Sequence, residues 1–392
     1  MQKDPAPGIS TPMKLLLLLL FWCLWYFNFS SRTILSPLLP VFENDLGISH
    51  TLAGSLSFYL SAGYTLSLLS AGWVTARVGS KKSIALSATV YLISLFLLRY
   101  SNSYSSIAAV SFFMGMGTGL YLPNAVPLLT SVFRPESWGR AFAVHETAPT
   151  FTFLSIPLLM ALFLRFFDWR DFILIFAGAC LIATCAFMIF APASPSQPGK
   201  GKGFTHLFRR KKFWIFTLVW TAASAAVMAV FTILPLLLVN ELGMSVQTAN
   251  SVMGISRIGA LIATFLVGFL VDRYGHMIML FWSLLLTGIS TIGIALSEYL
   301  PLLLIILILQ SAFSMIFFPI GLVAISRMTE PHERSHFTGG VGASSVIFGG
   351  GVAPLALGAA GDLWSFQNGI LILGILVTAS CLLFIPLRNL EK

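Results

Sequence analysis

Charged side chains are scarce in this sequence. Only 9% of its 392 residues are Asp, Glu, Lys or Arg, whereas 57% are hydrophobic. A soluble domain carries roughly 25% charged residues, so too few are present here to cover a water-facing surface. The mean hydropathy of +0.89 agrees with this. The composition excludes a soluble protein and predicts an all-α integral membrane protein with many spans.

Motifs for metal, redox and nucleotide chemistry are also missing. The four cysteines all lie in apolar segments, and none forms a CxxC pair or has a histidine at metal-ligand spacing. We therefore expect four buried thiols, no metal site, no cofactor and no catalytic residues. The G-x-x-x-x-G-K-[ST] loop that cradles nucleotide phosphates is absent. If the protein carries out a process that needs energy, we expect ion gradients rather than a bound nucleotide to supply it.

The basic residues are distributed unevenly, and the net charge is +9. No basic patch with interleaved aromatic residues occurs, which argues against nucleic-acid binding. Eighteen basic residues fall in segments on one side of the membrane, and only Arg99, Arg165 and Arg170 fall on the other. By the positive-inside rule we expect both termini in the cytoplasm and the protein in the inner or plasma membrane.

Apolar stretches of about 20 residues, the length that crosses a bilayer, predict twelve spans. They are residues 14–39, 51–75, 82–100, 104–130, 139–164, 170–191, 213–239, 248–271, 277–297, 301–325, 337–360 and 367–387. The Leu15–Leu20 run starts the first span and is not a cleavable signal peptide, because no small-residue cleavage site follows it. The domains are then 1–191 and 213–392, joined by a linker, 192–212, whose basic run lies near lipid headgroups.

A repeat with a constant spacing of 196 positions relates the two halves. It pairs Gly72 with Gly268, Arg77 with Arg273, and Gly79 with Gly275. The second copy, Gly268-Phe-Leu-Val-Asp272-Arg273-Tyr-Gly275, also has an acid, where the first copy has Ala76. The chain is therefore two copies of one membrane unit. We expect Gly72 and Gly268 to allow close helix packing, and Asp272 to pair with basic residues or helix amides in a gate.

Twelve spans, a central linker and the repeated G-x-x-x-D-R-x-G element together resemble the major facilitator superfamily. This resemblance implies two pseudo-symmetric six-helix bundles around a central cavity that alternates between two openings. It also implies a small-molecule substrate, protons or another coupling ion, and a monomer in the bilayer. The family has Asp where this chain has Ala76, which puts the strength of a first-half gate in question.

Two arginines lie inside spans, where a charge costs on the order of 3 kcal/mol. Arg32 shares a helical face with Asn28 and Ser36, and Arg257 lies near the midplane of span 8. Guanidinium groups match carboxylate or phosphate oxygens, so the pair suits an anion. The alternatives are that Arg32 snorkels to the headgroups and that Arg257 forms an ion pair between helices.

The surroundings of Arg32, with Pro40 eight residues later, resemble span 1 of the organic-phosphate and anion-cation symporter branches. Phosphate-ester carriers have a second arginine in span 7, where this chain has Val227. The second arginine is instead in span 8, as in nitrate and monocarboxylate carriers. The resemblance therefore favours a carboxylate over a phosphate ester.

His145 and Glu146 are the candidates for proton coupling in span 5. A carboxyl group or an imidazole at that depth can exchange protons near neutral pH. Neighbouring residues point about 100° apart on a helix, so we expect one of them to face the cavity and favour Glu146. The alternative is that Glu146 pairs with Arg140 or a cationic loop.

Other polar residues at mid-span are candidate cavity-lining groups, although each could equally bond another helix. They are Ser61, Tyr64, Asn124 and Gln310. The leading hypothesis is proton-coupled transport of a small organic anion. A proton-driven exporter of drugs, siderophores or amphiphiles is the alternative, although the glycine-proline motif of drug antiporters is absent from span 5. A receptor or scaffold without transport is a third hypothesis.

Overall fold

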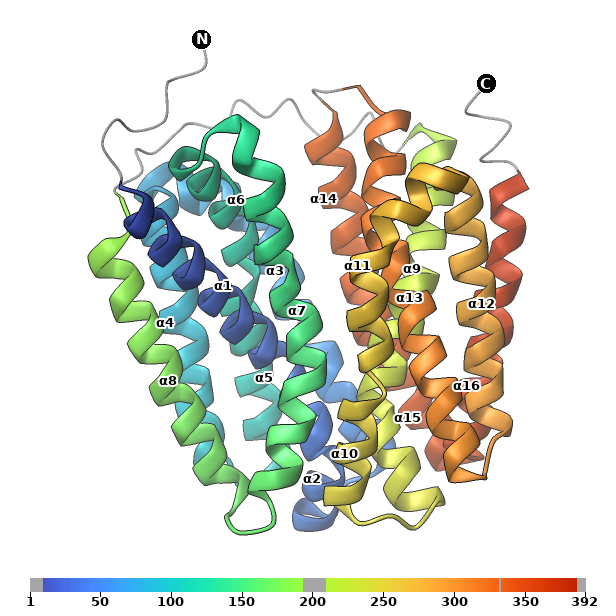
Figure 1. Ribbon diagram of the computed structural model, residues 1–392. Coiled ribbons are helices and arrows are strands. Elements are labelled where there is room, and N and C mark those ends of the chain that lie inside the picture. The colour runs from blue at the N-terminus through green and yellow to red at the C-terminus, as the bar shows by residue number, and fades with distance from the viewer. Residues whose placement is uncertain (1–9, 193–208, 331–332, 386–392) are drawn as a thin grey trace. The chain divides into compact units, whose positions relative to one another are not determined.

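The computed structural model describes residues 10–192, 209–330 and 333–385. These residues form helices and connecting turns without strands, and twelve of the helical segments are long and apolar enough to cross a membrane (Figure 1). The predicted fold class, all-α with twelve spans, is therefore confirmed.

The helices of the first half are α1 (Thr11–Thr33), η1 (Ser36–Leu38), α2 (Leu39–Leu46), α3 (His50–Val78), α4 (Ser80–Arg99), α5 (Tyr104–Gly119), α6 (Tyr121–Val132), α7 (Pro135–Phe163) and α8 (Trp169–Phe190). Those of the second half are α9 (Lys211–Leu236), η3 (Leu237–Glu241), α10 (Val246–Ile255), α11 (Ile258–Tyr274), α12 (His276–Leu296), α13 (Leu300–Met328), α14 (Arg334–Ser345), η4 (Val346–Val352), α15 (Ala353–Leu363), α16 (Phe366–Ser380) and η5 (Cys381–Leu383). The short segments η3 and η4 are π-helices.

Several spans are interrupted. Span 1 breaks after Thr33, span 4 is divided between α5 and α6, and span 8 is divided between α10 and α11. Spans 7 and 11 contain the π-helical turns η3 and η4. Interrupted helices leave backbone N–H and C=O groups outside the regular ladder, so each break needs partners from a neighbouring helix.

The chain forms two compact units. The first contains the described residues 10–35, 59–156 and 163–192, and the second contains 36–58, 157–162 and the described residues from 209 onward. Two stretches of the first half, 36–58 and 157–162, thus pack with the second unit. The predicted linker, 192–212, lies mostly outside the described residues, and its boundaries stay a prediction.

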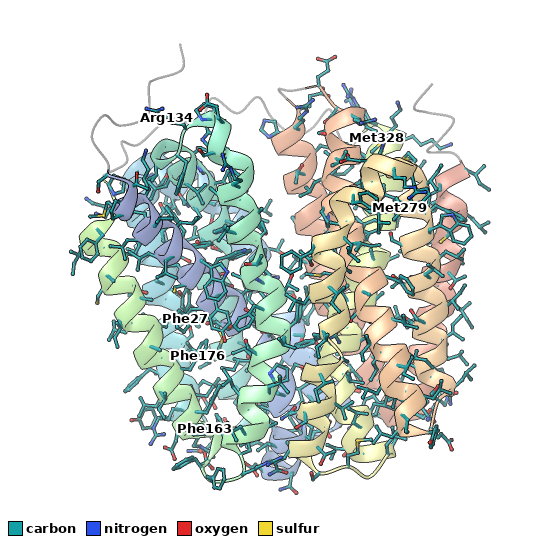
Figure 2. All side chains as sticks on the ribbon, viewed as in Figure 1. Phe27, Arg134, Phe163, Phe176, Met279 and Met328 are labelled. Atoms are coloured by element: carbon teal, nitrogen blue, oxygen red, sulfur yellow. The ribbon has the colours of Figure 1, made fainter. Side chains whose placement is uncertain are left out.

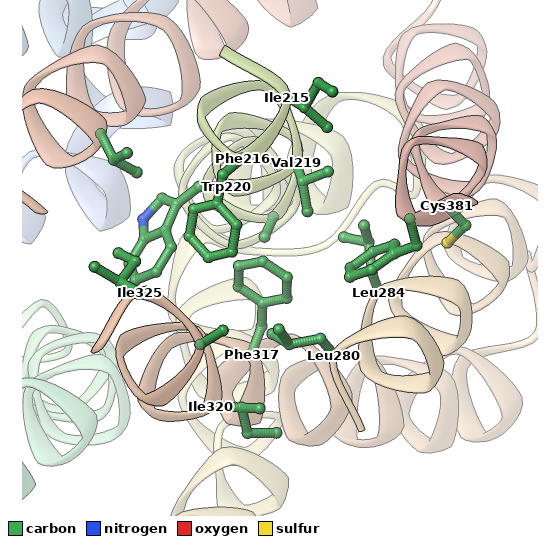
Figure 3. Close-up of a cluster of buried hydrophobic side chains, with 14 of the residues drawn as sticks. Ile215, Phe216, Val219, Trp220, Leu280, Leu284, Phe317, Ile320, Ile325 and Cys381 are labelled. Carbon is green, nitrogen blue, oxygen red and sulfur yellow. The ribbon is translucent and has the colours of Figure 1, made fainter. Parts of the chain in front are cut away.

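Aromatic side chains fill the interior of each unit. In the first unit Phe27 of α1 meets Phe176 of α8 edge to face, with ring centroids 5.2 Å apart (Figure 2). In the second unit Trp220 of α9 packs against Phe317 of α13, 5.7 Å away (Figure 3). Edge-to-face pairs of this kind add about 0.5–1.5 kcal/mol beyond the area they bury.

The four cysteines are free thiols, as expected, but they are not all buried. Cys180 and Cys381 are buried, Cys23 is partly buried and Cys185 is exposed. Cys185 lies on the outward face of α8, a helix apolar on all sides (mean hydropathy of the span 2.6). Lipid can cover such a face in place of protein, which is why an apolar segment did not imply burial for every cysteine.

The backbone confirms the repeat. The described residues with positive φ are all glycines, and they form two pairs 196 positions apart. Gly47 and Gly243 have φ of 61° and 64°, and Gly79 and Gly275 have φ of 77° and 81°. Glycine reaches these angles at no steric cost, so the same turns recur at the same places in both copies.

Candidate functional site

Both intramembrane arginines lie at helix breaks. Arg32 is the penultimate residue of α1, directly before the turn that leads into η1. Arg257 is the N-cap residue of α11, two residues after the end of α10 at Ile255. Ion and substrate sites in transporters are typically formed at discontinuous helices. The two predicted anion-binding residues therefore have the local setting that such a site requires, one in each compact unit.

The Arg32 guanidinium lies over aromatic rings. Its Cζ is 4.2 Å from the centroid of Tyr64 and 5.0 Å from that of Phe29. These contacts hold the cation by interaction with the ring faces, without neutralising its charge. Its Nε has no hydrogen-bond partner among the residues that the structure describes. The structure thus brings the predicted residues Arg32 and Tyr64 together.

Three residues of α1 form a polar stripe, defined as Trp25, Asn28 and Arg32. Their spacing of three and then four residues puts them on one helical face. Trp25 and Asn28 are 4% and 0% exposed. The Asn28 Nδ2 donates to the carbonyl of Thr118 at 3.1 Å. In the described part of the chain, Trp25 Nε1, Asn28 Oδ1 and Arg32 Nε find no partner, although buried polar atoms are nearly always hydrogen-bonded.

The sequence singled out Arg32 and Asn28 of this stripe but not Trp25. Trp25 does pack, since its indole stacks on Tyr121 at 5.2 Å and on His145 at 5.8 Å. Its unpartnered N–H is the feature that sequence reasoning missed. The three-residue spacing from Trp25 to Asn28 was the signal that could have identified it.

His145 and Glu146 form a pair. His145 is 1% exposed, and its Nδ1 lies 2.8 Å from Glu146 Oε1, whereas the Glu146 side chain is 52% exposed. On the other side of the ring, His145 Nε2 lies 3.1 Å from the Tyr121 hydroxyl. That hydroxyl donates to the Phe21 carbonyl at 2.8 Å. The two candidates for proton coupling are therefore in contact, and which of them faces a cavity stays a prediction.

The number of hydrogens available indicates that His145 and Glu146 share a proton when the Tyr121 hydroxyl donates to Phe21. The Tyr121 hydroxyl has one hydrogen, and the Phe21 carbonyl can only accept. While that hydrogen points to Phe21, His145 Nε2–H donates to the Tyr121 oxygen. The contact between His145 Nδ1 and Glu146 Oε1 needs one further proton, carried either by the imidazole or by the carboxyl group. Without it, two lone pairs would face each other at 2.8 Å.

In the second unit, Arg257 is 3% exposed, and its guanidinium lies 5.0 Å from the Phe231 ring of α9. Gln310 of α13 is fully buried and donates to the Ala226 carbonyl at 2.9 Å. Its Oε1 has no hydrogen-bond partner within the described residues. Asn250, which the sequence did not single out, is also fully buried and donates to the Pro37 carbonyl at 3.1 Å.

Asn124 and Ser61 are two further predicted cavity-lining residues. Asn124 of α6 donates to the Leu120 carbonyl at 2.8 Å and accepts from the Thr75 hydroxyl at 2.7 Å. The Thr75 contact links α6 to α3, which was the alternative considered for this residue, whereas the Leu120 contact lies within the first turn of its own helix. Ser61 is buried in α3, 3% exposed, and its contribution to a site stays a prediction.

The gating motif, which is the repeated element at residues 72–79 and 268–275, contains glycine turns but lacks the predicted packing. Gly79 and Gly275 begin α4 and α12 with positive φ. A Cβ added at Gly72 or Gly268 would meet no atom of the described residues within 4 Å. The expectation of close packing at these two glycines is therefore wrong for this structure, because both face open space.

The charges of this motif are at the surface. Arg77 lies over the Trp73 ring at 3.7 Å, and Arg273 lies 5.4 Å from the Tyr274 ring. Asp272 is exposed and forms no ion pair with a residue that the structure describes. The gate contacts predicted for Asp272 stay a prediction.

Twelve spans in two repeats, with an arginine at a helix break in each unit, define a polytopic membrane protein of the transporter class. The chain belongs to the Major Facilitator Superfamily, whose sequence model matches residues 21–260 and 221–392.

Individual relatives are distant. The chain is 22% identical to the 4-hydroxybenzoate transporter PcaK of Acinetobacter baylyi, over 83% of this chain and 80% of that protein. It is 20% identical to the multidrug resistance protein MdtL of a Shewanella species, over 62% and 63%. The solved structure of a D-xylose-proton symporter superposes with a TM-score of 0.79 at 15% identity, covering 96% of this chain and 97% of that one. At this identity the structural likeness shows the fold alone.

Proposed function

We propose that this protein is a secondary transporter that moves a small, hydroxylated organic carboxylate and couples the movement to protons. The polar stripe of α1 carries the proposal. It presents donors at Trp25 Nε1 and Arg32 Nε and an acceptor at Asn28 Oδ1, none of which has a hydrogen-bond partner among the described residues. Leaving buried polar groups without partners costs about 1–3 kcal/mol each, so a ligand with matching groups gains that energy.

The chemistry of the stripe selects the ligand. Arginine binds carboxylates through two parallel hydrogen bonds. Asn28 Oδ1 can only accept, so it requires a hydroxyl or amine hydrogen from the substrate. The rise of about 1.5 Å per residue separates Asn28 from Arg32 by about 6 Å along the helix. A carboxylate with a hydroxyl group at about that distance satisfies both residues.

Arg257 is the second anion-binding residue in this proposal. It is almost completely buried in the second unit, at the break between α10 and α11. A buried cation at a helix N-terminus adds to the positive end of the helix dipole. PcaK, a distant relative, is named as a carrier of a hydroxylated aromatic carboxylate, which fits the ligand that the stripe selects.

His145 and Glu146 carry the proton. In the protonated pair, Tyr121 donates to Phe21 and the shared proton joins the imidazole to the carboxyl group. When the proton leaves, the Tyr121 hydroxyl can turn toward His145 Nε2, so that Nδ1–H still donates to Glu146. The stacked rings of Trp25, Tyr121 and His145 connect this change directly to the substrate-binding stripe.

A thermal-shift and uptake experiment tests the proposal. Purified protein is heated with 4-hydroxybenzoate, benzoate, D-glucuronate, glycerol 3-phosphate or nitrate at pH 6 and pH 8. A ligand present at 100 times its Kd adds about 2.7 kcal/mol to the free energy of unfolding. We expect hydroxylated carboxylates to stabilise the wild type, and Arg32→Gln and Arg257→Gln to abolish that shift.

Arg99→Gln is the matched control, because Arg99 forms a peripheral ion pair with Asp171 at 2.9 Å. It should respond like the wild type. Equal stabilisation of wild type and both arginine variants would overturn the anion assignment. In proteoliposomes, Glu146→Gln should remove the dependence of uptake on a pH gradient, whereas uptake that still follows the gradient would overturn the proton assignment.

A proton-driven exporter of amphiphilic compounds is the second candidate. One observation favours it: Trp22 and Tyr26 of α1 stack in parallel at 5.5 Å, and both rings contact Phe151 of α7, which is 40% exposed. This apolar surface could bind flat, greasy molecules. Stabilisation by an amphiphilic cation such as ethidium, lost in Phe151→Ala but retained in Arg32→Gln, would make this function the better supported one.

A further inference from the structure

A serine from α13 is inserted at the break in span 8. The Ser311 hydroxyl lies 2.7 Å from the Ser256 carbonyl oxygen and accepts from the Ala260 N–H at 3.2 Å. Those two backbone groups are four residues apart, the pair that a continuous α-helix would join directly. The hydroxyl's single hydrogen can go to Ser256 or to the Ile308 carbonyl of its own helix, 2.8 Å away. Insertion of a side chain into the backbone ladder is a recognised cause of a break.

The first repeat supplies an internal comparison, because the same two helices cross there in the same way. A Cβ added at Gly63 would lie 2.0 Å from the Phe112 carbonyl oxygen, and one added at Gly259 would lie 2.0 Å from the Ile308 carbonyl oxygen. Both residues and both carbonyls are 196 positions apart. The backbones of α3 and α5 therefore approach each other as closely as those of α11 and α13.

The two crossings differ at one position. Gly115 stands in the first repeat where Ser311 stands in the second. A Cβ at Gly115 would meet the Leu60 carbonyl oxygen at 2.0 Å and the Tyr64 nitrogen at 2.9 Å. These are the repeat counterparts of the Ser256 carbonyl and the Ala260 amide. Without a side chain at Gly115, α3 runs unbroken from His50 to Val78.

The break determines the direction in which the Arg257 side chain points from the helix. Ser256 and Arg257 form a tightened turn in which the Arg257 N–H bonds the Gly254 carbonyl at 3.0 Å. A hydrogen bond to the third preceding residue is typical of a 3₁₀ turn, in which the angle between successive side chains around the axis is larger than in an α-helix. Closing the helix would therefore rotate Arg257 relative to α10 and move its guanidinium away from its position over Phe231.

We infer that Ser311 is a positioning residue for Arg257: its hydroxyl keeps span 8 open and thereby sets the direction of the substrate-binding arginine. The inference rests on the proposed function in one respect, that Arg257 binds the anion. The break itself depends only on contacts within the second unit. Ser311 is 1% exposed and Ser256 0%, so water does not compete for these hydrogen bonds.

Three substitutions at Ser311 test the inference by uptake of labelled 4-hydroxybenzoate and D-glucuronate. Ser311→Gly installs the residue of the first repeat and should raise KM about 10- to 100-fold, since small misplacements of a binding group have effects of this size. Vmax should change much less. Ser311→Ala should behave similarly, and Ser311→Thr, which keeps a hydroxyl, should restore KM to within a few-fold of the wild-type value.

Ser314→Gly is the matched control. Ser314 is one turn further along α13 and 2% exposed, and its hydroxyl bonds the Ser311 carbonyl of its own helix at 3.3 Å. The Ser314→Gly variant loses a buried hydroxyl and gains the same backbone flexibility as Ser311→Gly, yet it should leave KM unchanged. An unchanged KM in Ser311→Gly, or equal increases in Ser311→Gly and Ser314→Gly, would overturn the inference.

A second measurement separates this inference from the proposed function. The structure of Ser311→Gly should show one continuous helix from Val246 to Tyr274, with an Ala260 N–H to Ser256 carbonyl bond. A break that persists in that variant would overturn the inference, whatever the transport result. If the wild type takes up neither probe while the helix closes as expected, the proposed function fails and the assignment of the break to Ser311 holds.

Discussion

Helix α3 and the pair α10 and α11 are repeat counterparts, yet α3 is continuous and its counterpart is broken. Both cross their neighbour at a glycine, Gly63 or Gly259, with the same approach to a carbonyl oxygen. The break coincides with a serine, Ser311, in place of Gly115. The comparison teaches that one hydroxyl group can distinguish two otherwise equivalent helix crossings.

The same contrast applies to the charged residues. Each unit has one arginine at a break in its spanning helices, but the two arginines are not repeat counterparts. Arg257 corresponds to Ser61 in the unbroken α3, and Arg32 corresponds to Met228 in the unbroken part of α9. The repeats thus share the helix crossings and turns that depend on glycine, whereas the buried arginine occupies a different position in each repeat.

The largest expected effect is on the shared crossings. Gly63→Ala and Gly259→Ala place a methyl group 2.0 Å from a backbone carbonyl oxygen, so the helices must separate. Overpacking typically costs about 1–3 kcal/mol and occasionally more, and we expect about 3 kcal/mol for each variant. Gly72→Ala and Gly268→Ala, which meet open space, serve as controls in the same thermal unfolding series. Equal stability of all four variants would contradict the close approach.

The second effect is on function and separates the counterparts Arg257 and Ser61. Arg257→Gln removes a buried charge and should lower uptake of the hydroxylated carboxylate about 10- to 150-fold, because charge-assisted hydrogen bonds are worth about 1.5–3 kcal/mol. Ser61→Ala removes at most one neutral hydrogen bond, worth about 0.5–1.5 kcal/mol, so its loss should stay below about tenfold. Uptake kinetics in proteoliposomes measure both, and a larger loss in Ser61→Ala would reverse the comparison.

A third, smaller effect tests whether the repeats share their turns. Gly79 and Gly275 adopt φ of 77° and 81° with ψ of 163° and 152°, a region that only glycine enters freely. Replacing either by alanine should lower the free energy of unfolding by about 2 kcal/mol. The two losses should agree closely, measured by thermal unfolding in one detergent. A loss at only one site would show that the turns are not equivalent.

The sequence predicted the fold class, the twelve spans and the repeat, because these follow from hydropathy and from residue spacing within the chain. It also selected both arginines, since a charge inside an apolar span is conspicuous. It did not predict the break at Ser256 and Arg257, because no proline occurs there and the apolar pattern continues. That break is made by a side chain of another helix, Ser311, which no local pattern contains.

One packing expectation was wrong and one contact was not foreseen, both because they depend on how side chains meet in the folded chain. Gly72 and Gly268 were expected to pack closely, but whether a glycine faces a neighbouring helix depends on tertiary structure that composition does not specify. The contact between His145 and Glu146 was not foreseen, because adjacent Cβ atoms point about 100° apart. Their side chains are long enough to bend toward each other, and they meet at 2.8 Å.

The smallest expected effect concerns how the counterpart helices begin. The N-terminus of α3 is capped by a residue of α15: Asp362 accepts from the N–H groups of His50 and Thr51 at 3.0 and 2.8 Å and from the Thr51 hydroxyl. Both helix starts also have a local serine cap, since the Ser49 hydroxyl accepts from the Leu52 N–H at 3.3 Å in α3 and its counterpart, the Ser245 hydroxyl, accepts from the Thr248 N–H at 3.2 Å in α10. Asp362→Ala and Ser245→Ala should each cost about 1 kcal/mol, the usual value of an N-cap.

The two caps should respond differently to salt, which sharpens the comparison. A carboxylate at a helix N-terminus acts partly through the helix dipole, and salt screens that contribution. The effect of Asp362→Ala on the unfolding temperature should therefore shrink between 0.05 and 1 M NaCl, whereas that of Ser245→Ala should stay constant. Asp362→Asn, which keeps one acceptor oxygen but loses the charge, should fall between the wild type and Asp362→Ala at low salt. Identical salt responses of the two alanine variants would mean that the Asp362 cap acts through hydrogen bonds alone, so that the two helix starts differ in the origin of their caps but not in the physics.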